Sequence, residues 1–230
     1  MQEDTELKLR NIVESTANTI VNYNVDTAMD LSEIGIDSLL DDSIFKEIPI
    51  VKTIYGVAKT GFAIREKHML KKTLVFINQL NNNGLLNEKY IEYKEKLKNK
   101  DEFAFKELEY VLIIIDRYVE LNKNIILANL YFNYIDKKID WNQFQELSII
   151  VDNIFLSDLE ELEKIYQKRA ITMNDINNKI SFRRLRVQNL VEDIESMLRM
   201  PNGSIGMYYN ENDYQITLLG TLLYEYGLNK

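Results

Sequence analysis

The chain has 230 residues, 46% of them hydrophobic and 28% charged, a composition typical of globular proteins with a substantial core. Its formal net charge of −8 argues against a protein that binds nucleic acid through overall basicity. The absence of cysteine excludes disulfides, cysteine-ligated zinc and thiol catalysis, and it predicts a cytoplasmic location.

The N-terminal part of the chain predicts helices. Residues 5–22 carry a loose helical stripe, and the acidic residues 24–47 predict one or two short helices. Pro49 suits the first turn of a helix that runs from Ile48 to Leu80, because proline lacks the N–H that this turn leaves unpaired. The NNNG of residues 81–84 predicts its end.

Within this long helix, residues 48–64 are unusually apolar and are followed by a basic cluster at residues 65–72. A helix that lies on a membrane surface has this pattern, and so does a core helix whose end emerges into water. We expect burial in the core, with the basic cluster and His68 on a solvated face, rather than peripheral membrane contact by residues 48–72. No uncharged apolar run of about 20 residues predicts a membrane-spanning helix, and the charged first ten residues lack the apolar core of a signal peptide.

The middle of the chain predicts four further helices, at residues 87–98, 101–119, 122–138 and 141–155. The second has a buried-face period formed by Leu108, Val111, Leu112, Ile115 and Val119. Asp140 with Gln143, and Ser157 with Glu160, have the spacing of capping boxes that open the next two helices. We therefore expect a helical bundle of about seven helices over residues 1–156.

Few residues in this bundle suggest chemistry. Asp116 and Glu120 are four residues apart and would share a face of one helix, where Asp136 or Asp140 could complete an oxygen-ligand metal site. A charged helix rim explains the same residues. The chain has no phosphate-binding glycine loop, no GxSxG and no HExxH, and its single histidine cannot build a polyhistidine site. We expect a non-enzymatic protein without catalytic residues, metal or cofactor, and a metal-dependent enzyme is a further alternative.

Two segments, LKKTLVFINQL and NKNIILANLYFNYIDKKIDWNQFQEL, resemble small helical bacterial domains of the tellurite-resistance B type. The resemblance implies a helical bundle. The acidic metal motifs of that family are not matched, so the resemblance does not imply a metal site.

The last third of the chain has a different order of predicted elements, and we expect a separate domain at residues 157–230. A helix at 157–168 precedes a short helix at 172–180 and a longer one that Ser181 opens and that runs to Leu198. Two β-like runs, SIGMYY and YQIT, then surround the polar NEND, and Thr217 caps a last helix that ends at Gly227.

This order resembles the winged helix-turn-helix superfamily, and the segments that carry the resemblance are ITMNDINNKI, RVQNLVEDIESML and YQITLLGTLLYEYG. In that superfamily the third helix often enters the DNA major groove. The resemblance places there Arg183, Arg184, Arg186 and Gln188.

The charges around these residues favour a protein partner over DNA. Glu192, Asp193 and Glu195 would repel phosphate, and the predicted hairpin turn contains two acids and no base. The sequence therefore predicts a mainly α protein, a helical bundle followed by a winged-helix-like domain. We expect a bacterial or phage interaction protein with a regulatory, accessory or defence role, and a DNA-binding transcriptional regulator is the alternative.

Overall fold

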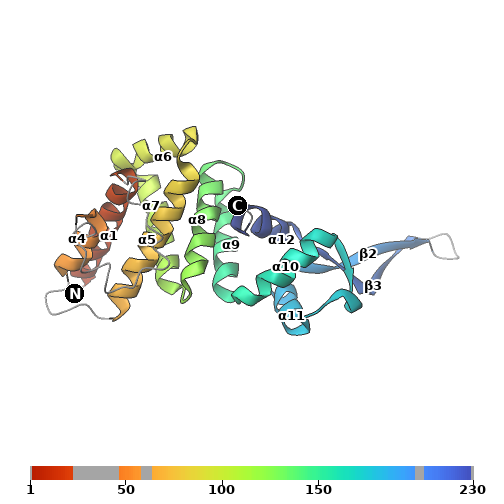
Figure 1. The fold of residues 1–230 in the computed structure, drawn as a ribbon. Coiled ribbons are helices and arrows are strands. Elements are labelled where there is room, and N and C mark those ends of the chain that lie inside the picture. The colour runs from red at the N-terminus through yellow and green to blue at the C-terminus, as the bar shows by residue number, and fades with distance from the viewer. Residues whose placement is uncertain (1, 23–46, 58–63, 200–204, 229–230) are drawn as a thin grey trace. The chain divides into compact units, whose positions relative to one another are not determined.

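The computed structural model describes residues 2–22, 47–57, 64–199 and 205–228 (Figure 1). The chain is mainly helical, as predicted, with ten α-helices in the described residues and a three-stranded antiparallel sheet near the C-terminus. It divides into two compact units, Met1–Asp140 and Trp141–Lys230, and each is described by itself. The division lies one helix before the predicted boundary at residue 157.

The first unit contains helices α1 (Gln2–Asn22), α4 (Pro49–Val57), α5 (Ile64–Gly84), α6 (Glu88–Lys98), α7 (Glu102–Arg117) and α8 (Leu121–Ile135). Helix α5 packs along α8, and α1 contacts α4, α6 and α7. Local caps start two of these helices where the sequence predicts: the side chain of Asn87 accepts from the N–H of Tyr90, and that of Asp101 from the N–H of Ala104, each at 3.0 Å. The predicted short helices at residues 24–47 lie, except for Glu47, outside the described residues.

The apolar segment after Pro49 contributes to the core of this unit. The buried side chains that pack together here come from α4 and α5, and they are Ile50, Val51, Ile54, Leu70, Leu74 and Val75. Among the helices that the structure describes, none is both long and apolar enough to cross a membrane.

The basic cluster at residues 65–72 is only partly solvated, so that prediction is wrong for two of its members. Lys71 and Lys72 are buried. The Lys72 ammonium donates to the backbone carbonyls of Asp116 and Tyr118, at 2.9 and 2.8 Å. These are carbonyls at the end of α7, where a cation also interacts favourably with the helix dipole.

Helix α7 ends earlier than its apolar period predicts. The helix stops at Arg117, and Tyr118 is already extended, with ψ of 130°. Val119 therefore lies beyond the helix and is 91% exposed, so its predicted place on the buried face is wrong.

The second unit contains α9 (Trp141–Asn153), α10 (Leu156–Lys168), the strand β1 (Ala170–Thr172), the 3-10 helix η2 (Met173–Asp175) and α11 (Lys179–Val187). Strands β2 (Val191–Arg199) and β3 (Ile205–Ile216) follow, then α12 (Leu218–Leu223) and the π-helix η3 (Tyr224–Leu228). In the sheet, β3 lies between β1 and β2 and is antiparallel to both.

The predicted helix at residues 181–198 is wrong in its second half. Asn178, whose side chain accepts from the N–H groups of Ile180 and Ser181, opens α11, and the helix ends at Val187. Asn189 then adopts a left-handed conformation with φ of 56°, which ends the helix and turns the chain into β2. Residues 191–199 form this strand because they pair with β3.

The predicted hairpin is longer than expected. The strand β3 contains residues 205–209 and 214–216 of the two β-like runs and the whole NEND between them, so the predicted turn at NEND is wrong. The predicted short helix at 172–180 is reduced to η2, where Asp175 accepts from the backbone N–H and the hydroxyl of Thr172, both at 2.9 Å. Thr217 caps α12 as predicted, accepting from the N–H of Gly220 at 3.0 Å.

Candidate functional site

Helix α11 carries the arginines that the sequence singles out. Its inner side is fixed by the buried Ser181, Phe182 and Leu185. Arg183, Arg184 and Arg186 lie around the remaining surface of the helix, and Gln188 is its C-cap. The structure thus places all four predicted residues on or at the end of one helix, but it gives the three arginines different surroundings.

Arg184 forms an ion pair with a buried carboxylate of the same unit. Its Nε donates to Asp158 Oδ2 at 2.8 Å, its Nη2 donates to Asp158 Oδ1, and its guanidinium lies 4.6 Å from the centre of the Phe155 ring. The Asp158 side chain is completely buried. A bidentate pair of this kind is strong and directional, so Arg184 is not available to a partner without leaving a buried charge uncompensated.

The surroundings of Asp158 explain its ionisation. Burial alone would raise the pKa of this carboxyl, but hydrogen bonds from Arg184, Ser181 and the backbone N–H of Phe155 outweigh the burial. The pKa of Asp158 therefore lies below its ordinary value, and the group is a carboxylate at neutral pH.

Arg186 is also engaged within the unit. Its guanidinium forms an ion pair with Asp193 on β2 and lies 5.1 Å from the centre of the Tyr214 ring on β3. This ion pair connects the end of α11 to the sheet. The Arg186 side chain is 40% exposed, so this ion pair lies at the surface and contributes little to stability.

Arg183 differs from both neighbours. It is exposed, and it has no ion pair or hydrogen bond with any residue in the described part of the chain. Ile180 and Val187 lie three residues before and four after it, which places all three on one side of α11. Ile180 is 65% exposed and Val187 is 81% exposed. We call Ile180, Arg183 and Val187 the α11 face.

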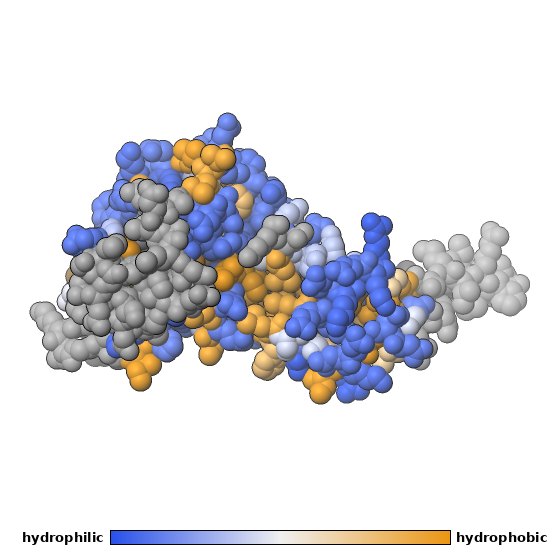
Figure 2. All heavy atoms as spheres, in the orientation of Figure 1, coloured by the Kyte–Doolittle hydropathy of each residue, from blue (hydrophilic) through white to orange (hydrophobic). Residues whose placement is uncertain are grey.

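The two apolar members of the α11 face were not among the predicted site residues. Their seven-residue separation, with the buried Phe182 and Leu185 between them, is the sequence signal that places them opposite the core side. On the side of the molecule that Figure 2 shows, the surface over α10 and α11 is mainly hydrophilic, with hydrophobic side chains at its lower edge.

The predicted carboxylate pair in the first unit is not formed, because its two members do not share a helix. Asp116 is in the last turn of α7 and forms an ion pair with Arg65, whereas Glu120 follows the end of α7 and lies 3.7 Å from the Lys123 ammonium. Asp136 binds Asn87, Lys89 and Lys138. Within the described ranges, no three His, Asp or Glu side chains are grouped so that they could hold a metal ion.

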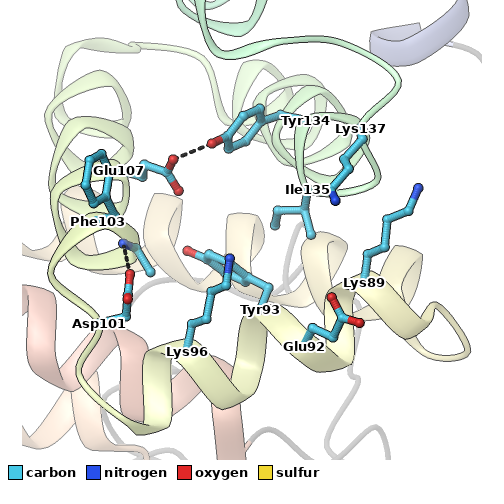
Figure 3. Close-up of a pocket in the computed structure, with 11 residues that line it drawn as sticks. Lys89, Glu92, Tyr93, Lys96, Asp101, Phe103, Glu107, Tyr134, Ile135 and Lys137 are labelled. Carbon is cyan, nitrogen blue, oxygen red and sulfur yellow. Dashed lines mark hydrogen bonds between the residues drawn. The ribbon is translucent and has the colours of Figure 1, made fainter.

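The first unit contains a pocket that the sequence did not indicate (Figure 3). It has a volume of about 390 Å³ and lies between one side of α6, the start of α7 and the end of α8. Its lining contains equal numbers of basic and acidic side chains together with aromatic ones. The lining residues are Lys89, Glu92, Tyr93, Lys96, Asp101, Phe103, Ala104, Glu107, Tyr134, Ile135 and Lys137.

Hydrogen bonds fix one wall of this pocket. The hydroxyls of Tyr93 and Tyr131 are 2.6 Å apart, and the Tyr134 hydroxyl donates to Glu107 Oε1. Burial raises the pKa of Glu107, against the opposing effects of this hydrogen bond and of the Lys96 charge. Burial also raises the pKa of Tyr93 and of Tyr134, so both hydroxyls are protonated at neutral pH.

Some of the remaining charged side chains of the pocket form hydrogen bonds or ion pairs within the unit, and others do not. Lys89 binds the backbone carbonyl and carboxylate of Asp136, and Asp101 caps α7. Lys96 and Lys137 are exposed and have no hydrogen bond or ion pair within the described part of the chain. Figure 3 shows both ammonium groups directed toward the space between the three helices.

No protein-family model, curated protein or solved structure matches this chain.

Proposed function

We propose that this protein acts by binding another protein through the α11 face, as a non-enzymatic regulatory or adaptor protein of a bacterium or phage. The observation that carries the proposal is the arrangement of one helix: an arginine without a described partner lies between two exposed apolar side chains. Protein interfaces combine apolar contact with an arginine in this way, because the apolar side chains exclude water around the charged hydrogen bonds.

The chemistry of the partner follows from the charges around this face. Residues 176–191 contain one lysine, three arginines and no acid, within a chain whose net charge is −8. Arg184 and Arg186 are already neutralised by Asp158 and Asp193. The partner surface should therefore present one carboxylate to Arg183, surrounded by apolar side chains that cover Ile180 and Val187.

The order of elements in the second unit supports a winged-helix-like domain as its framework. Helices α10 and α11 and the β2–β3 hairpin stand for the first helix, the third helix and the wing of that resemblance, whereas η2 is all that corresponds to its second helix. In that interpretation α11 is the third helix of the domain, the element that such domains often present to a partner.

DNA is the second candidate partner, because α11 is locally basic. Phosphate binding normally uses several unengaged cations, and here two of the three arginines are held by internal carboxylates. The exposed Ile180 and Val187 also provide no contact to phosphate. These observations favour protein over DNA.

Binding measurements with surface variants test the proposal. Val187→Asp and Arg183→Glu should each reduce recovery of the partner from a native lysate by about tenfold or more, the effect expected for central interface residues. Leu86→Asp is the matched control, because Leu86 is 95% exposed and lies in the first unit. Equal recovery of the same proteins by all three variants would refute the proposed face.

A titration with duplex DNA separates the second candidate. If the partner is a protein, the chain should show no DNA binding of the specific kind, that is, binding that weakens between 50 and 200 mM salt and is also reduced by Arg183→Glu. A DNA-binding protein would show both effects, since each phosphate contact adds to the salt dependence.

A further inference from the structure

The pocket between α6, α7 and α8 has the size and chemistry of a small-ligand site, which goes beyond the proposed function of α11. Its volume of about 390 Å³ falls in the range of sites that enclose small organic molecules. All of its lining residues belong to the first unit, whereas the α11 face belongs to the second.

The pocket offers two cations for one anionic group. Lys96 on α6 and Lys137 after α8 are directed into the space between the helices (Figure 3), and neither forms a hydrogen bond or ion pair in the described part of the chain, although the Lys96 charge acts on Glu107. Lys89 is not available, because it binds Asp136. Flexible ammonium groups that border one space from two elements are suited to the oxygens of a phosphate.

The α7 side of the pocket offers an acceptor and aromatic surface. The Tyr134 hydroxyl binds one oxygen of Glu107 and thereby orients the carboxyl, and the other oxygen has no hydrogen bond among the described residues. That oxygen can accept from an amino group. The Phe103 side chain is 80% exposed at the same end, where its ring could stack on a flat base.

From these three features, we propose that the pocket binds a nucleoside phosphate whose base carries an amino group. The phosphate contacts Lys96 and Lys137, the amino group donates to Glu107, and the base lies against Phe103. Glu92 lines the same pocket and opposes the phosphate by charge.

Calorimetric titration of the full chain with AMP, adenosine and inorganic phosphate tests this proposal. AMP should bind with a dissociation constant of about 1 mM or below, and adenosine and phosphate at least about tenfold more weakly. If phosphate alone binds as well as AMP, the base contacts are refuted. If adenosine binds as tightly as AMP, the lysine contacts are refuted. If AMP does not bind, the site is refuted.

Surface variants locate the binding. Lys96→Ala and Lys137→Ala should each weaken AMP binding by about tenfold, and Glu107→Gln should weaken it because the new amide N–H groups face the amino group. Glu92→Gln should strengthen it by about twofold, because a repelling charge is removed. Lys98→Ala is the matched control, since Lys98 lies on α6 outside the pocket and contacts Glu95. AMP binding that none of the pocket variants changes would overturn the proposal.

Discussion

At the scale of single residues, Asp158 is a buried carboxylate that connects two helices of the second unit. It is fully buried, and it accepts hydrogen bonds from Arg184 on α11 and from the backbone N–H of Phe155, the latter at 3.2 Å. The same carboxylate therefore holds α11 against the start of α10 and removes Arg184 from the set of residues that a partner can contact.

Asp158→Ala should lower the free energy of unfolding by about 2 kcal/mol at pH 7, the contribution of hydrogen bonds to a charged group. Because the folded-state pKa of Asp158 lies below its unfolded value, this contribution is complete above the unfolded pKa and is lost as the pH falls through the folded one. Chemical denaturation of both proteins between pH 7 and pH 2 measures it.

The control for this prediction is Glu160→Ala. Glu160 is an exposed residue of the same helix, and its replacement should change stability by less than about 0.5 kcal/mol. A difference between wild type and Asp158→Ala that grows as the pH is lowered would contradict the account of this pair.

At the scale of elements, α12 is held close to the turn between α11 and β2. The N–H of Thr217 donates to the carbonyl of Leu190 at 3.1 Å, and its hydroxyl donates to that of Asn189 at 2.8 Å. A methyl group on Gly220 would lie 2.3 Å from the Leu190 oxygen. A residue without a side chain is therefore required one turn into this helix.

Gly220→Ala should destabilise the protein by about 1–3 kcal/mol, the usual cost of overpacking, because a backbone atom has to move. Gly56→Ala should have the opposite sign. Nothing lies within 4 Å of a methyl group at Gly56 in α4, so alanine there should stabilise by about 0.5–1 kcal/mol through the unfolded chain. Thermal unfolding of the two variants compares them, and equal shifts in Tm would contradict the close packing at Gly220.

Elements that depend on local signals could be predicted from the sequence. Asn87, Asp101 and Thr217 cap helices that start where they were expected, since a cap uses only the next three residues. Residues 191–198 were expected in a helix because their own preferences allow one. They form β2 because of the left-handed Asn189 and the pairing with β3, and the second of these is a tertiary effect.

The candidate sites could be predicted less well, for the same reason. The sequence placed the arginines on a helix, but Asp158, which engages Arg184, lies 26 residues earlier in the chain. The pocket combines side chains from three helices, and no spacing within one segment indicates that Lys96 and Glu107 line the same space.

At the scale of the whole molecule, a substitution that destabilises one unit should leave the stability of the other unchanged. All described contacts of Asp158 lie within residues 141–230. In native-state hydrogen exchange, Asp158→Ala should therefore reduce the protection of amides in the second unit and leave the core helices α5 and α8 of the first unchanged. An equal loss of protection in both units would contradict the division at residue 140.

The locally basic α11 contrasts in charge with the chain as a whole, whose net charge is −8. The proposed interface therefore requires a partner whose well-placed carboxylate is attracted to Arg183. The proposed function requires this face to be an interface with another protein.

Site-specific crosslinking tests that claim most directly. A benzophenone amino acid is introduced at Val187 in cells that express the protein naturally, with Leu86 as the comparison position, and the irradiated adducts are identified by mass spectrometry. The account predicts a protein adduct at position 187 that is absent at position 86 and is lost when Arg183 is changed to Glu. Adducts with nucleic acid at position 187, or the same proteins at both positions, would contradict it.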